Sequence, residues 1–88
     1  MVWTVKFSDE AKRNLKKLDK STQKRITHFL QTRLQNTDNP RATGKSLQGN
    51  LSGLWRYRIG DFRLLCRIED GELIILVIEI GHRKEIYK

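Results

Sequence analysis

The first residues of the chain alternate between apolar and polar side chains, which is the pattern of a strand with one buried face. One side of this segment is apolar and the other is polar, with Trp3, Val5 and Phe7 opposite Thr4 and Lys6. We therefore predict a half-buried strand over residues 2–7.

Two helices are predicted next, because the apolar positions change to spacings of three and four residues. The first covers about residues 9–18, and Ser8 is placed to cap its start. The second begins near residues 19–21 and ends around residues 35–36, ahead of the helix-breaking Pro40. The apolar stripes are formed by Ala11, Leu15 and Leu18 in the first helix and by Ile26, Phe29, Leu30 and Leu34 in the second. A short link joins the two stripes, so we expect a helical hairpin.

The second half of the chain predicts a three-stranded antiparallel meander after a loop over residues 41–53. The strands cover residues 54–59, 62–69 and 72–80. Gly60-Asp61 and Asp70-Gly71 are both suited to two-residue hairpin turns. Helices that precede a meander indicate an α+β domain, with the helical hairpin packed on one face of a small twisted sheet. A single domain over residues 1–88 accounts for the whole chain.

The turn at Gly60 sets a register that gathers arginines on one face of the sheet. Arg58 then faces Arg63 across the hairpin, while Arg56 and Arg67 lie on the same side. Like charges placed directly opposite destabilise a sheet, so this arrangement favours a bound anion. Planar guanidinium groups match the oxygens of phosphate. The alternative is a solvated face whose arginines pair with nearby acids, which are Glu69, Glu72 and Glu79.

The predicted turn at Asp70 also places apolar side chains on this arginine face. They are Leu65, Ile74, Leu76, Ile78 and Ile80. An apolar patch of this size on a free surface predicts a protein partner. A slipped register between the last two strands is the alternative explanation.

The composition indicates an acidic partner. The chain has 18 lysines and arginines against 10 acidic residues, a net charge of +8, which favours nucleic acid over an acidic protein or a membrane surface. The longest apolar run, at residues 73–78, is too short for a membrane helix. The single cysteine, Cys66, excludes an internal disulfide, fits a reducing cytoplasm and is expected in the core. One cysteine and two histidines cannot form a four-ligand zinc site, so we expect no metal and no cofactor.

Four segments carry a resemblance to a known family. They are residues 53–64 (GLWRYRIGDFRL), residues 80–87 (IGHRKEIY), the helix opening at residues 7–15 and the segment at residues 45–47. In their order and spacing they resemble the RelE branch of the RelE/ParE superfamily, the toxins of bacterial type II toxin–antitoxin pairs. The resemblance extends over essentially the whole chain and implies a RelE-like fold.

The resemblance implies a ribosome-dependent endoribonuclease, an mRNA interferase that cuts messenger RNA in the A site and so inhibits translation. In the family scheme, which uses no metal, the 2′-hydroxyl attacks the adjacent phosphate and leaves a 2′,3′-cyclic phosphate and a 5′-hydroxyl. The family's functional residues map to Arg56, Arg58, Arg63, Arg83 and Tyr87. We add His82 as a candidate proton carrier, and Lys12, Lys16, Lys17 and Lys84 as candidate contacts to RNA or ribosome, with a solvated lysine face as the alternative.

The implied partners are a cognate antitoxin protein, the 70S ribosome and its messenger RNA. The toxin–antitoxin complex is expected to be hetero-oligomeric and to reach operator DNA through the antitoxin. No membrane partner is implied.

One departure from the family pattern concerns the proton acceptor. The best-understood relatives have lysines where this chain has Arg56 and Arg58. Arginine keeps its proton, so it stabilises developing charge but is a poor general base. His82, Tyr87, Lys84 or positioning by the ribosome are the alternatives for proton transfer.

Two further functions compete with RNA cleavage. One is a ParE-like inhibitor of DNA gyrase that cuts no RNA, against which the retained Arg63, Arg83 and Tyr87 argue. The other is a catalytically inactive module that acts with its antitoxin as a co-repressor.

Overall fold

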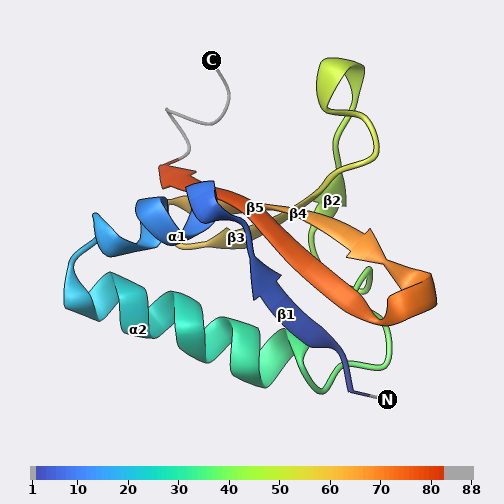
Figure 1. Cartoon of the computed structure of the whole chain (residues 1–88), viewed down its shortest axis with the longest axis horizontal. Coiled ribbons are helices and arrows are strands. Elements are labelled where there is room, and N and C mark those ends of the chain that lie inside the picture. The colour runs from blue at the N-terminus through green and yellow to red at the C-terminus, as the bar shows by residue number, and fades with distance from the viewer. Residues whose placement is uncertain (1, 83–88) are drawn as a thin grey trace.

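A five-stranded sheet forms the centre of the molecule, with the strands in the order β1-β5-β4-β3-β2 (Figure 1). We describe residues 2–82 of this computed structural model. The strands are β1 (Thr4–Phe7), β2 (Lys45–Ser46), β3 (Trp55–Ile59), β4 (Phe62–Glu69) and β5 (Ile74–His82). β1 runs parallel to β5, and every other neighbouring pair is antiparallel. The predicted α+β class is confirmed.

Two helices lie on one face of this sheet, as Figure 1 shows. They are α1 (Asp9–Lys16) and α2 (Lys20–Phe29), and α2 continues through a π-helical turn at Leu30–Leu34. Ser8 caps α1 as predicted, because its hydroxyl oxygen accepts a hydrogen bond of 3.0 Å from the Ala11 amide. Two short 3₁₀ turns, Gly49–Leu51 and Asp70–Glu72, lie in loops.

The core fills the space between the helices and the sheet. Its fully buried members include Ile26 and Leu34 from the second helical segment and Leu64, Ile75 and Val77 from the strands. Burial of these apolar side chains is the main force that holds the two layers together. Cys66 is 0% exposed and belongs to this core, as the sequence predicts.

The last two strands pair in a different register from the predicted one. The connection is longer than two residues, because Leu73 adopts a left-handed conformation (φ 54°) after the 3₁₀ turn. Arg67 therefore pairs with Leu76 rather than with Ile74. Asp70 is also held in place, because the Arg41 guanidinium donates to both of its carboxylate oxygens at 2.8 and 2.9 Å and lowers its pKa.

A β-bulge shifts the register again by one residue. Cys66 pairs with Val77, but Leu65 pairs with Glu79, so Ile78 is an extra residue in β5. An odd shift moves all later side chains to the opposite face, and Ile80 is consequently 3% exposed in the core. The prediction was wrong for Ile80 alone, because Leu76 and Ile74 pair with Arg67 and Glu69 and so stay on the arginine face with Leu65. Val2 is the one exposed large apolar residue of the described chain. The slipped register therefore accounts for Ile80 but not for the other members of the predicted patch.

Candidate functional site

The arginines of the β3–β4 hairpin share one face, because this hairpin has the predicted register. Arg58 pairs with Arg63, and Arg56 pairs with Leu65. Arg58 is exposed, whereas Arg63 is only 5% exposed. The Nη1 atom of Arg63 donates to the carbonyl oxygens of Gly60 and Phe62, both at 3.3 Å. The structure thus brings three predicted site residues onto one surface.

Arg63 is a buried cation with an unusual environment. No carboxylate of the described residues contacts it, and its Nε atom has no hydrogen-bond partner there. A buried charge held only by neutral carbonyl groups is costly for the fold. The guanidinium is therefore suited to an anion that approaches from the open face of the sheet.

A tethered loop borders the arginine face on the side of β2. The Tyr57 hydroxyl donates to the Pro40 carbonyl, and the Trp55 indole donates to the Thr43 carbonyl at 2.8 Å. Burial raises the pKa of Tyr57 well above its ordinary value, so the phenol keeps its proton as a donor. Gly44 lies so close to β3 that a Cβ atom there would be 2.4 Å from the Arg56 carbonyl oxygen. These contacts fix Lys45 opposite Arg56.

The structure does not bring His82 to the arginines. His82 pairs with Phe62, and the two rings meet edge-to-face with centroids 5.8 Å apart. It lines a hollow of about 480 Å³ on the helix side of the sheet, together with Asn14 and Lys17. The residue opposite Arg63 on β5 is Gly81. The bulge at Ile78 is the cause, because it moves His82 to the opposite face.

The predicted lysines lie in the helical layer. Lys12, Lys16 and Lys17 are exposed on or just after α1, so they do not share the arginine surface. Arg83, Lys84 and Tyr87 lie outside the described residues. Within residues 2–82, no group of three His, Cys, Asp or Glu side chains could hold a metal ion, and no helix could cross a membrane.

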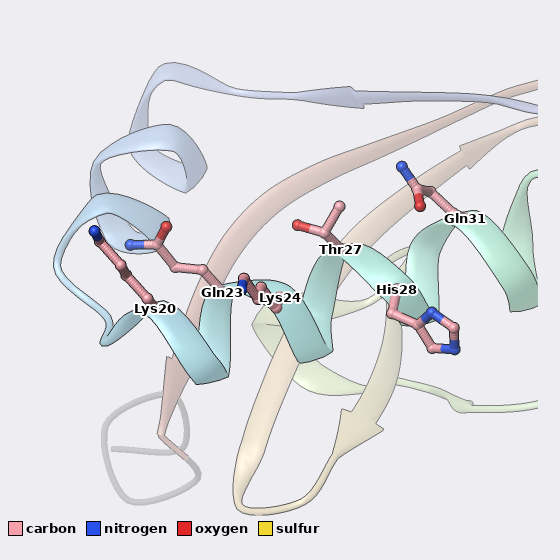
Figure 2. A pocket seen from close by; sticks show the side chains of 6 residues that line it. All are labelled: Lys20, Gln23, Lys24, Thr27, His28 and Gln31. Carbon is pink, nitrogen blue, oxygen red and sulfur yellow. The ribbon is translucent and has the colours of Figure 1, made fainter.

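A second hollow lies on the outer surface of α2 and has a volume of about 480 Å³ (Figure 2). Its lining comes from this helix alone and consists of Lys20, Gln23, Lys24, Thr27, His28 and Gln31. One histidine among amides and lysines provides neither a paired acid and base nor an enclosed site. We therefore assign this surface no chemistry.

Sequence reasoning missed two cations, Arg25 and Arg33, which line hollows next to Arg58. Their spacing in the sequence is the signal that could have identified them. Arg25, Phe29 and Arg33 recur every four residues, so they lie on one stripe of the helical segment. Phe29 packs on Tyr57 with ring centroids 5.9 Å apart, and this contact turns the stripe toward β3.

Comparison with known proteins gives consistent matches over nearly the whole chain. Residues 5–87 match the family described as ParE toxin of type II toxin-antitoxin system, parDE. The chain is 33% identical over 88 residues to toxin RelG of Mycobacterium tuberculosis, covering 100% of this chain and 99% of the relative.

Two solved structures show the same fold. A chain of the toxin-antitoxin complex RelBE2 from Mycobacterium tuberculosis superposes with a TM-score of 0.85 and 31% identity, covering 94% of this chain and 100% of that chain. A chain of the archaeal RelE-RelB complex from Pyrococcus horikoshii superposes with a TM-score of 0.74 and 25% identity, covering 94% and 97% respectively. The likeness therefore includes the hairpin that carries the arginines.

Proposed function

This chain belongs to the RelE/ParE superfamily as a RelE-family toxin of a type II toxin–antitoxin system, and we propose that it is a ribosome-dependent endoribonuclease that cuts messenger RNA in the A site. The observation that carries this proposal is the Arg58–Arg63 pair, in which the buried Arg63 guanidinium contacts two carbonyl groups and no carboxylate of residues 2–82. A cluster of this kind is suited to the charge of a phosphodiester at the moment of its cleavage.

The proposed reaction is an internal phosphoryl transfer. The 2′-hydroxyl oxygen bonds to the adjacent phosphorus, the bond from phosphorus to the 5′-oxygen breaks, and a 2′,3′-cyclic phosphate and a 5′-hydroxyl result. Negative charge builds on the phosphoryl oxygens in the transition state, and fixed guanidinium groups stabilise it there. Arg56, Arg58 and Arg63 take this role, and Arg83 and Tyr87 complete the proposed site. Because arginine is a poor general base, proton transfer falls to another group.

The toxin is proposed to act in the cytoplasm and to be silenced by a cognate antitoxin. The solved relatives from Mycobacterium tuberculosis and Pyrococcus horikoshii were crystallised as toxin–antitoxin complexes. An acidic antitoxin that covers the arginine face would neutralise its charge and block RNA at the same time. The resulting hetero-oligomer would reach operator DNA through the antitoxin.

The test is primer extension on a defined message in a purified translation system. We expect cuts in A-site codons that require ribosomes, and a loss of about 10²–10³-fold in cleavage rate for Arg58→Gln and for Arg83→Ala. The matched control is Arg67→Gln, which removes an exposed arginine from the same face of the neighbouring strand.

The family match also names parDE, so supercoiling by DNA gyrase is measured in parallel. An intact message together with blocked supercoiling overturns the proposal in favour of a gyrase inhibitor. If the folded protein does neither but binds its antitoxin, the co-repressor explanation takes its place.

A further inference from the structure

Two hollows lie side by side along the outer edge of β3. One has a volume of about 370 Å³, and its lining includes Lys45 and Arg56. The other, of about 380 Å³, includes Arg25 in its lining. Both are lined by Phe29, Arg33 and Arg58, so they adjoin one another, and we refer to the two hollows together as the groove.

The groove is strongly basic. Its cations are Arg25, Arg33, Lys45, Arg56 and Arg58, and no acidic residue of the part of the chain that the structure describes lines either hollow. Within residues 2–82, neither Arg25 nor Arg33 contacts a carboxylate. Gathering cations around a shallow groove raises the electrostatic energy of the free protein, so the arrangement favours a polyanion.

The edge of the sheet at the groove is also partly uncovered. β2 pairs with Trp55 and Arg56, so from Tyr57 to Ile59 the outer edge of β3 has no neighbouring strand among residues 2–82. Arg25 lies over the hairpin turn, because its Nη1 atom would be 3.0 Å from a Cβ atom at Gly60. Cations on both walls and no bulky strand between them are suited to an extended phosphate backbone.

We propose that this groove binds the phosphate backbone of the messenger RNA that flanks the cut. The inference rests on the proposed function, because Arg58 belongs both to the proposed cleavage site and to the groove. A strand whose scissile phosphate lies at Arg58 and Arg63 continues over the edge of the sheet toward Arg33 and Arg25. The groove therefore extends the substrate site from the arginine face to the helical layer.

The first experiment measures RNA binding as a function of salt. The probe is a fluorescent, single-stranded 12-mer with 2′-O-methyl groups throughout, which cannot be cut, and the readout is anisotropy from 50 to 200 mM KCl. The logarithm of the affinity decreases with the logarithm of the salt concentration, and for Arg25→Gln/Arg33→Gln we expect this slope to become shallower by about 1.4. The advantage of the wild type over this variant should therefore shrink about sevenfold across the salt range.

The control carries the same charge change on the neighbouring surface of the same helix, where Lys20 and Lys24 line the outer hollow but neither hollow of the groove. Lys20→Gln/Lys24→Gln removes two lysines from the surface in Figure 2, and its slope should match the wild type. Equal slopes for all three proteins, or no binding by the wild type, overturn the proposal. Thermal unfolding confirms that the variants fold, and Arg25→Lys/Arg33→Lys should restore the slope because it keeps both charges.

The second experiment identifies the RNA on the ribosome. Cys66 is 0% exposed, so a maleimide photocrosslinker attaches selectively to an added surface cysteine. Thr32→Cys places the label in the groove, and Gln31→Cys places it in the outer hollow. We expect crosslinks to the message from Thr32→Cys alone, whereas crosslinks from this position to ribosomal RNA or protein overturn the proposal. If the wild type cuts no message but its RNA binding still depends more steeply on salt than that of Arg25→Gln/Arg33→Gln, the proposed function is overturned and RNA binding by the groove is supported.

Discussion

Arg63 and Arg58 show what local sequence can determine at the scale of a residue. Their pairing follows from a two-residue turn at Gly60 and from strict alternation, so the register was predictable and was confirmed. Arg25 and Arg33 were not predicted as site residues. In the sequence, a helical arginine that lines a site looks the same as one that only faces solvent, until the neighbouring element is known. That neighbour, β3, is distant in the sequence.

Cys66 gives a prediction at this scale. Burial raises the pKa of its thiol from 9.0 to about 12, so above pH 9 the unfolded chain loses a proton that the folded protein keeps. Stability due to this group is complete below pH 9 and is lost as the pH rises toward 12, by at most about 1.4 kcal/mol per pH unit. Urea unfolding followed by tryptophan fluorescence should show a steeper alkaline decline for wild type than for Cys66→Ala. Parallel curves would contradict this assignment.

At the scale of elements, the register of β5 was the part that sequence could not give. Residues 73–78 are all apolar, so alternation carries no information about which face each side chain takes. The bulge at Ile78 has no glycine or proline to mark it. Side chains at the start of α1 and within it form hydrogen bonds with the backbone around the bulge instead. Ser8 Oγ donates to the Ile78 carbonyl at 2.6 Å, and the Ile80 amide donates to Asn14 Oδ1 at 3.0 Å.

This link between α1 and the bulge can be tested at Asn14. Asn14→Leu has a similar size but no acceptor, so the Ile80 amide loses its partner, and we expect the free energy of unfolding to fall by about 1–3 kcal/mol. Asn14→Asp retains the acceptor and should lose less than half as much. Urea denaturation of the three proteins measures the difference. Equal losses for the two variants would show that the amide does not depend on this acceptor.

At the scale of the whole molecule, β1 and β5 lie side by side and run parallel. No local sequence pattern predicted this pairing. The sequence predicted four of the five strands, whereas β2 (Lys45–Ser46) lies in the segment predicted as a loop. The place of β1 beside β5 depends on both helices crossing one face of the sheet. The same layering distributes cations over both sides of the protein. Arg56, Arg58, Arg63 and Arg67 lie on the open face of the sheet, whereas Lys12 and Lys16 are exposed on α1.

The charge distribution makes a prediction about salt. Two ion pairs are seen among residues 2–82, Arg13–Glu10 and Arg41–Asp70, and both are exposed, so they contribute little. The net charge of +8 acts against the compact state, and Arg58 opposite Arg63 adds a local repulsion. Added salt screens repulsion more strongly in the folded chain than in the expanded unfolded chain.

We therefore expect salt to stabilise this protein. Raising KCl from 20 to 300 mM at pH 7 should increase the free energy of urea unfolding by about 0.5–1 kcal/mol, the scale of surface charge effects. Urea is the right denaturant because it is uncharged and leaves the ionic strength under independent control. Arg58→Gln should be more stable than wild type at low salt and should gain less from added salt, because one partner of the opposed pair is gone. A wild type that loses stability with salt would mean that attractive pairs outweigh the repulsion, and the arginine cluster would then need no absent anion to account for it.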